Sequence, residues 1–246
     1  MARGFASADD SYLSCSAVVG SVPLTMAGWF YNTVDGGGHQ LMCISNSAAA
    51  NESFLLQWAG NVAGDPIRAW QRNADTIGWA VTTSGVSSGE WFHAAGVFTA
   101  NDERSALLNG ASKDTDNTSV GSFTPNITSM GKLVRSTATS ASDIWAAECG
   151  IWNVALTDAE VVVLAAGYSP LLVRPQNLVA YWPLIRDTDD DIVGGYSMTP
   201  VNSPTVAAHP RVFYPGMPHV GYAAAAIAAL RIPRHPAAYY GGPTVF

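Results

Sequence analysis

The sequence predicts an all-β fold on which one short helix packs. The chain of 246 residues contains 23 glycines and 14 prolines, which divide it into apolar runs of strand length. Asn109-Gly110, between two such runs, is a strong signal for a β-hairpin. Helix signals are complete in one stretch, residues 157–167. A chain of this length would allow one all-β domain or two smaller ones.

The expected strands follow from apolar runs and the turns between them. A first strand is expected within residues 3–16, where the Asp9-Asp10 pair predicts a turn. Residues 24–31 alternate between an apolar face and a half-aromatic face, which is typical of a strand that covers a core. The same reasoning predicts further strands at residues 40–45, 52–60, 66–72, 77–83, 90–98, 104–109, 111–118, 123–134, 144–152 and 178–184.

The helix is predicted from its two ends. Thr157 and Glu160 have the spacing of a capping box, in which each side chain accepts the backbone N–H of the other residue. Residues 161–166 supply an apolar face, and Gly167 stands where a left-handed C-terminal cap is needed. Since two or three turns do not form a stable helix alone in water, we expect this helix to pack on the β scaffold to which the preceding strand, residues 144–152, belongs.

Four phrases in order resemble laminin-G-like domains of the concanavalin A-like jelly-roll superfamily. They are PLTMAGWFY at residues 23–31, GEWFHAAGVF at 89–98, ALLNG at 106–110, and the stretch from GKLVRSTAT to IWNVALTDAEVVVLAAG at 131–167. The resemblance covers residues 5–206 and implies a concanavalin A-like jelly-roll sandwich of two antiparallel sheets with one short helix. Laminin-G-like modules are also found in phage structural proteins, so the resemblance permits such a role.

Charge and composition favour some partners over others. Charged residues make up 13% of the chain, about half the usual share, and hydrophobic residues 48%. Either an exterior rich in uncharged polar residues or assembly with other subunits would explain this. The formal net charge is −7 with two lysines, so the body offers no basic field for nucleic acid.

The cysteines and the apolar runs indicate in which cellular compartment the protein is made. Cys15, Cys43 and Cys149 lack metal-ligand spacing and are expected to be buried free thiols. The first residues carry no apolar region of a secretory signal. The longest apolar run of the tail, residues 223–230, is too short to span a membrane. We therefore expect cytoplasmic synthesis without membrane insertion.

The predicted domain organisation is a laminin-G-like sandwich at residues 1–207 and a Pro- and aromatic-rich arm at residues 208–246. The arm carries three arginines and no acidic residue, so its charge is +3 and that of the remainder is −10, because −7 minus +3 is −10. Its prolines favour extended segments, and its large apolar groups argue against a disordered linker. The candidate partner-binding residues are Arg211, Phe213, Tyr214, Tyr222, Arg231, Arg234, Tyr239, Tyr240 and Phe246.

Three tryptophans, one in each of three successive expected strands, are candidates for sugar binding. Trp58, Trp70 and Trp79 would form a stacked strip if they shared an exposed face. The alternative, which we favour at this point, is that they fill the interior of the sandwich. His93 has no acidic partner at a useful spacing and is interpreted as a structural strand histidine.

An acidic cluster follows the last expected core strand. Asp187, Asp189, Asp190 and Asp191 could supply oxygens to calcium, although the glycine and closing glutamate of an EF-hand loop are missing. A solvated acidic turn is the favoured interpretation. We expect no metal and no other cofactor, with calcium as the alternative.

The motifs of catalysis are missing from the sequence. The five glutamates do not form the Glu-x-Asp-x-Glu arrangement of glycoside hydrolases on this fold, and there is no nucleophile elbow or P-loop. The chain is therefore not expected to be an enzyme.

The leading functional hypothesis is a virion structural protein, namely a phage capsid decoration or cement protein attached through its C-terminal arm. It would be located on the virion surface, with further copies of itself, as a homo-oligomer, or the major capsid protein as partners. The alternative is a carbohydrate-binding, lectin-like module of a fibre or spike, with a glycan as its partner.

Overall fold

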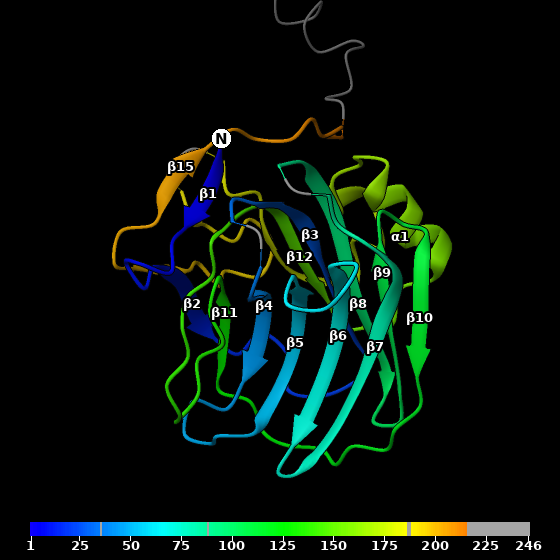
Figure 1. The fold of residues 1–246 in the computed structure, drawn as a ribbon. Coiled ribbons are helices and arrows are strands. Elements are labelled where there is room, and N and C mark those ends of the chain that lie inside the picture. Colours follow the sequence, from blue (N-terminus) through cyan, green and yellow to red (C-terminus); the bar gives the residue numbers. More distant parts are fainter. Residues whose placement is uncertain (35, 88, 186–187, 216–246) are drawn as a thin grey trace, which may run out of the picture. The chain divides into compact units, whose positions relative to one another are not determined.

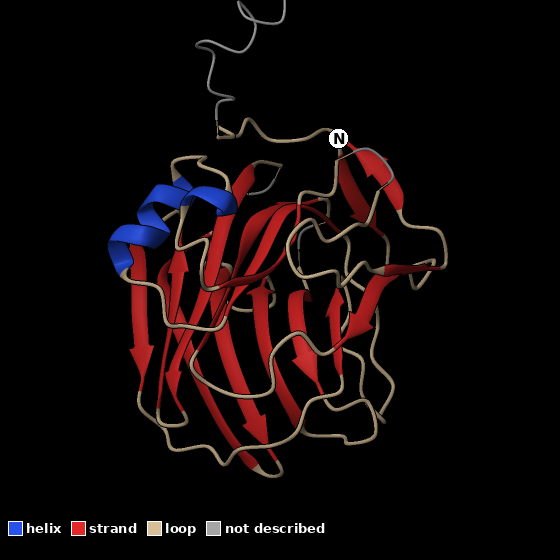
Figure 2. Cartoon of the chain, turned by 180° about the vertical axis from the view of Figure 1, so that it is seen from behind, coloured by secondary structure: helices blue, strands red, loops and turns tan. Residues whose placement is uncertain are grey.

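The computed structural model describes residues 1–34, 36–87, 89–185 and 188–215. Within them the chain forms two antiparallel sheets and one α-helix, so the predicted sandwich is confirmed (Figures 1 and 2). Residues Met1–Tyr214 make one compact unit. No helix among the described residues has the length and apolar character needed to cross a membrane.

The first sheet is the one on whose outer face the helix packs. Its order is β10 (Ser112–Asp116), β9 (Glu103–Leu108), β8 (Trp91–Ala100), β3 (Leu24–Asn32), β12 (Ile144–Trp152), β1 (Ala2–Phe5) and β15 (Thr205–Ala207). A further strand, β13 (Leu178–Trp182), also pairs with β12. The end of β12 near Ile144 contacts β1, and the end near Trp152 contacts β13.

The second sheet has seven strands. Its order is β14 (Thr199–Val201), β2 (Tyr12–Ser16), β11 (Ile127–Met130), β4 (Gly38–Ser45), β5 (Glu52–Ala59), β6 (Pro66–Asn73) and β7 (Thr76–Gly85). The expected strand at residues 123–134 is reduced to β11, because Pro125 precedes it and Gly131 ends it with a φ of +82°.

The main core lies between the inner faces of the two sheets. Alternation along each strand sends every second side chain inward, for example Phe54, Leu56 and Trp58 of β5. These side chains meet Phe30 and Phe98 of the first sheet in one apolar cluster. The residues of opposite parity therefore face outward.

The single α-helix, α1 (Asp158–Ala165), covers part of the outer face of the first sheet (Figure 2). The predicted capping box is confirmed: the Thr157 N–H donates to Glu160 Oε2 over 2.7 Å, and the Glu160 N–H donates to Thr157 Oγ1 over 3.4 Å. Val161 and Leu164 are buried against a second apolar cluster that contains Trp152. Gly167, with a φ of +92°, follows the helix as expected.

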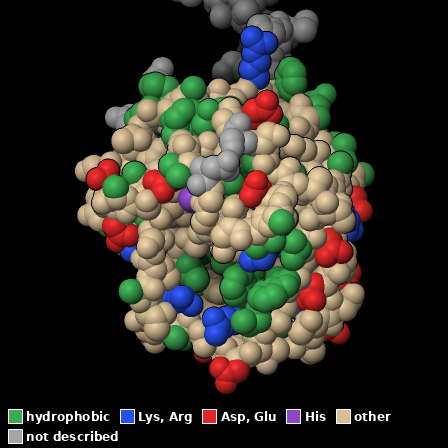
Figure 3. Space-filling model, viewed as in Figure 1, with side chains coloured by type: hydrophobic (Ala, Val, Ile, Leu, Met, Phe, Trp, Pro, Cys, Tyr) green, Lys and Arg blue, Asp and Glu red, His purple; other side chains and the backbone are tan. Residues whose placement is uncertain are grey.

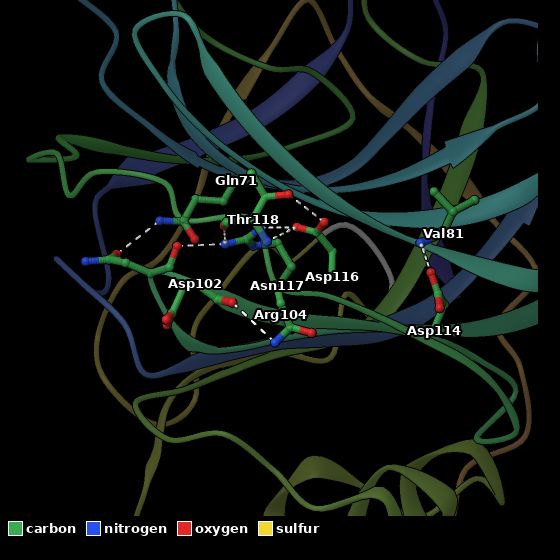
Figure 4. A network of polar contacts seen from close by, with 9 residues as sticks. Gln71, Val81, Asp102, Arg104, Asp114, Asp116, Asn117 and Thr118 are labelled. Carbon is green, nitrogen blue, oxygen red and sulfur yellow. Dashed lines mark hydrogen bonds and ion pairs between the residues drawn. The ribbon is translucent and has the colours of Figure 1, made fainter.

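The two sheets are joined along one side, where β10 of the first sheet lies beside β7 of the second (Figure 4). The Val81 N–H on the edge of β7 donates to Asp114 Oδ2 of β10 over 3.3 Å. The fully buried Arg104 of β9 forms an ion pair with Asp116 and donates to the carbonyls of Asn101 and Thr118, each over 2.8 Å. Side chains of β10 therefore accept hydrogen bonds from backbone N–H groups on the edge of β7, where another strand could otherwise pair.

The chain continues past β15 as a segment, residues 208–214, that packs on the body. Phe213 donates its N–H to the Gly167 carbonyl over 2.7 Å and accepts from the Ser169 N–H over 2.9 Å. The Tyr214 hydroxyl donates to Glu148 of β12 over 2.5 Å. The arm residues expected to bind a partner further along, Tyr222, Arg231, Arg234, Tyr239, Tyr240 and Phe246, lie outside the described residues.

Candidate functional site

The outer face of the second sheet carries an aromatic and apolar row that runs across four strands. Strand register places Cys43 of β4 opposite Leu55 of β5, Leu55 opposite Trp70 of β6, and Trp70 opposite Trp79 of β7. All four side chains have the parity that points away from the core. Within the described residues no helix covers this row, in contrast to the outer face of the first sheet.

Trp70 and Trp79 form the exposed end of the row. Their rings make an edge-to-face contact with centroids 5.4 Å apart and an interplanar angle of 71°. Trp79 is 45% exposed, whereas Trp70 is half-buried. The Arg68 guanidinium lies 5.6 Å from the centroid of the Trp79 ring. Figure 3 shows hydrophobic side chains gathered over β6 and β7, with Lys or Arg side chains beside them.

A hollow of about 190 Å³ opens beside Trp70 on the same face. Leu55 and Leu133 supply apolar lining, and Gln40, Gln57, Arg72 and Arg135 supply polar groups. Leu133 and Arg135 belong to the segment between β11 and β12, which crosses over β4. This segment is held there by the Ser45 hydroxyl, which donates to the Val134 carbonyl over 2.6 Å.

A second hollow, of about 370 Å³, adjoins the first. Arg135 and Thr139 line both, and Tyr12 and Lys132 line the far part of the second. We call the two hollows together, with Trp70 and Trp79 at one end, the outer-face groove.

Several buried polar atoms of this face have no hydrogen-bond partner among the described residues. They are Gln57 Oε1, Arg68 Nε, Trp70 Nε1 and Arg135 Nε. Gln57 is only 7% exposed. A buried donor or acceptor without a partner costs about 1–3 kcal/mol, so a ligand with complementary groups would recover this free energy.

The structure separates the three tryptophans predicted to act together. Trp58 is fully buried and stacks on His39, with centroids 4.6 Å apart. It belongs to the core because it has the same parity as Phe54 and Leu56, whereas Trp70 and Trp79 have the outward parity. The core interpretation thus describes Trp58, and a strip on the exposed face can contain only the other two.

The acidic cluster is engaged in contacts within the protein. Asp189 forms an ion pair with Arg3, with Oδ1 2.8 Å from Arg3 Nε. The Asp191 carboxylate accepts four backbone N–H groups, those of Tyr181, Val193, Gly194 and Tyr196. Asp190 accepts from the Ser197 hydroxyl, and Asp187 lies outside the described residues. Within residues 1–215, apart from 35, 88 and 186–187, no three or more His, Cys, Asp or Glu side chains are grouped so that they could hold a metal. Calcium binding stays a prediction.

Glu148 is a buried carboxylate for which the sequence showed no signal. It lies in a bulge of β12 with a φ of +55° and accepts from the hydroxyls of Tyr181 and Tyr214. Burial and the Glu148 carboxylate raise the pKa of both tyrosines. His209 Nε2 lies 3.1 Å from Glu148 Oε1. Burial lowers the pKa of His209, but hydrogen bonds to Glu148, Pro210 and Pro183 outweigh it, so the pKa lies above its ordinary value.

Three further residues singled out in the sequence can be placed. His93 is buried against the edge of Trp29, and burial lowers its pKa to about 3, so the ring is neutral at physiological pH. Arg211 and Phe213 are exposed, Phe213 by 62%, and the Phe213 ring contacts Tyr168 with centroids 5.5 Å apart.

Solved structures share this fold. A heptameric SAP-like pentraxin from Limulus polyphemus is 14% identical, with 81% of this chain and 89% of that chain covered and a TM-score of 0.59. A "putative carbohydrate binding protein" from Bacteroides ovatus is also 14% identical, with 85% of this chain and 59% of that chain covered and a TM-score of 0.63. At this identity the likeness shows a concanavalin A-like fold alone. The sequence matches no protein-family model and no curated protein.

The residues that sequence analysis missed are those of the groove walls. Arg68, Trp70 and Arg72 alternate with core residues on β6, so their common face could have been inferred from the period of two. Gln57 has the outward parity on β5 in the same way. Leu133 and Arg135 gave no signal, because they reach the groove through a segment without periodic structure.

Proposed function

We propose that this chain is a carbohydrate-binding module that holds a saccharide in the outer-face groove. The observation that carries the proposal is the exposed Trp79 and half-buried Trp70 beside a hollow with unpartnered polar atoms. A pyranose ring presents apolar C–H groups on its face and hydroxyls at its edge. An aromatic platform with polar groups beside it complements both.

The "putative carbohydrate binding protein" from Bacteroides ovatus, which has the same fold, supports this proposal by analogy. The same comparisons offer no support specific to a phage capsid. The virion role, the capsid or self partner and the absence of enzymatic activity stay predictions of the sequence.

The test is a binding titration of the full-length protein against a panel of neutral and acidic oligosaccharides. Trp79→Ala should weaken binding of any saccharide that the protein holds by about tenfold or more, because truncating a central aromatic contact typically costs more than about 1.4 kcal/mol. Trp70→Ala should have an effect of the same order. Thermal unfolding of each variant shows that the fold is retained.

Trp91→Ala is the matched control, since Trp91 is a half-buried aromatic on the outer face of the first sheet. This change should leave saccharide affinity unaltered. If the whole panel fails to bind, the proposed function is wrong. If binding survives the changes at Trp70 and Trp79 but is lost with Trp91, the site lies on the other sheet.

A further inference from the structure

The arginines of the outer-face groove differ from most cationic side chains of this protein. Five lysines and arginines of the described residues are held in ion pairs with carboxylates: Arg3, Arg104, Lys113, Lys132 and Arg174. Of the four described ones that have no ion pair, Arg68, Arg72 and Arg135 lie on the groove face. The fourth, Arg211, is exposed in residues 208–214.

Arg72 and Arg135 converge on the hollow from two segments of the chain, and Arg68 lies over the ring of Trp79. Arg68 and Arg72 stand on either side of Trp70 on β6, and Arg135 reaches the same hollow from the crossing segment. The two that line the hollow are each held at one side only: Arg72 Nε donates to the Ala74 carbonyl over 3.3 Å, and Arg135 Nη1 donates to the Ala50 carbonyl over 3.1 Å. A guanidinium has five N–H donors, so most of them remain for a ligand.

Among the described residues, none with a carboxylate lines the hollow beside Trp70. This is unusual in a chain with a formal net charge of −7. In the adjoining hollow, Asp10 is neutralised by Lys132, whose Nζ lies 2.5 Å from Asp10 Oδ2. The part of the groove next to the tryptophans therefore presents positive charge that no described residue of the protein compensates.

Other groups at the hollow would be complemented only by a ligand that also has hydrogen-bond donors and an apolar surface. Gln57 Oε1 is a buried acceptor without a partner among the described residues, and it needs a donor that chloride, sulfate and a carboxylate group lack. Sugar hydroxyls supply such a donor. The ring of Trp79 offers an apolar surface beside the charge.

We infer that the groove takes a saccharide bearing a carboxylate on its ring, with Arg72 and Arg135 on the carboxylate and Trp70 and Trp79 on the apolar face of a sugar. This inference rests on the proposed function and names the class of its ligand. Arginine suits this role because its planar donors match the two oxygens of a carboxylate.

The experiment compares acidic oligosaccharides with their own methyl esters, which keep the rings and hydroxyls and lose the charge. The full-length protein is titrated with galacturonate, glucuronate, mannuronate and sialylated oligosaccharides, each beside its ester and a neutral oligomer of equal length. At least one acid should bind about tenfold or more tightly than its ester at low salt. The ratio should shrink at high salt, since the site is open to solvent.

Variants assign the preference to the arginines. Arg72→Gln and Arg135→Gln keep a long polar side chain without charge, and each should lower the affinity for the acid by about fivefold or more and reduce the ratio of acid to ester. Arg211→Gln, at the unpaired arginine away from the groove, should leave the ratio unchanged. Thermal unfolding checks that every variant is folded.

The outcomes separate this inference from the function on which it rests. If neutral oligomers or esters bind as tightly as the acids and binding depends on Trp79, the module function stands and the charge preference is wrong. An acid preference that Arg72→Gln and Arg135→Gln leave intact also overturns the inference. If neither acids nor neutral sugars bind, the proposed function itself fails.

Discussion

Gly78 has no side chain, and the Arg104 guanidinium occupies the space where a side chain at position 78 would lie. The Arg104 guanidinium lies against the backbone of Gly78, where a Cβ would stand 1.8 Å from Arg104 Nη1 and 2.7 Å from Asp116 Oδ2. Arg104 cannot swing away, because its guanidinium is held by Asp116 and by the carbonyls of Asn101 and Thr118. Glycine is thus required here for space, since its φ is not in the left-handed region.

Gly78→Ala should therefore destabilise the protein by about 1–3 kcal/mol, the usual cost of overpacking a filled interior. Urea unfolding monitored by tryptophan fluorescence measures the change. Gly20→Ala is the control, because a Cβ at Gly20 meets no atom within 4 Å, and it should change stability by less than about 0.5 kcal/mol. Equal stability of the Gly78 variant and the wild type would contradict this account.

At the residue scale, sequence reasoning could place a side chain on a face but could not tell which face is open. The parity of Trp58 with Phe54 and Leu56 was readable, as was that of Trp70 with Arg68 and Arg72. Which tryptophans remain exposed depends on where the crossing segment and α1 lie. Those positions are set by tertiary contacts between distant residues.

Helix α1 is the element that the sequence predicted most completely, because its signals are local. The capping box involves two residues three positions apart, and Glu160 is held further by an ion pair with Arg174. By contrast, β14 and β15 have three residues each and no apolar alternation. They form because β2 and β1 offer free edges, which the sequence does not show.

Thr157→Ala removes the side-chain acceptor for the Glu160 N–H and should destabilise the protein by about 1 kcal/mol. Thr157→Ser keeps the oxygen and is the matched control, with stability close to that of the wild type. Chemical denaturation of the three proteins gives both differences. The capping role is contradicted if the serine variant is as destabilised as the alanine variant.

Across the whole molecule, Glu148 connects strands far apart in the sequence. Its partners Tyr181 and Tyr214 lie 33 and 66 positions away, which explains why no local pattern revealed the cluster. Both ring nitrogens of His209 face oxygen acceptors: Nδ1 lies 2.8 Å from the Pro210 carbonyl, and Nε2 faces Glu148 and the Pro183 carbonyl. The protonated imidazolium, with two donors, suits this site.

The raised pKa of His209 predicts a pH dependence of stability. A group whose pKa is higher in the folded state stabilises that state fully below its unfolded pKa, about 6.5 for histidine, and this contribution disappears as pH rises through the folded pKa. The melting temperature should therefore fall on the alkaline side of pH 6.5 by more in the wild type than in His209→Gln. If the melting temperatures of the two proteins fell equally with pH over this range, His209 would make no such contribution.

The pairing of β1 with β15 has a mechanical consequence. Ala2 lies directly opposite Ala207, so the first and last strands of the sandwich are antiparallel neighbours whose outer ends meet. Their hydrogen bonds run perpendicular to the strands. A pulling force applied at these two residues would therefore load the bonds one after another, and β15 would separate from β1 at low force. The pairing of β1 with β12, on its other edge, would remain intact.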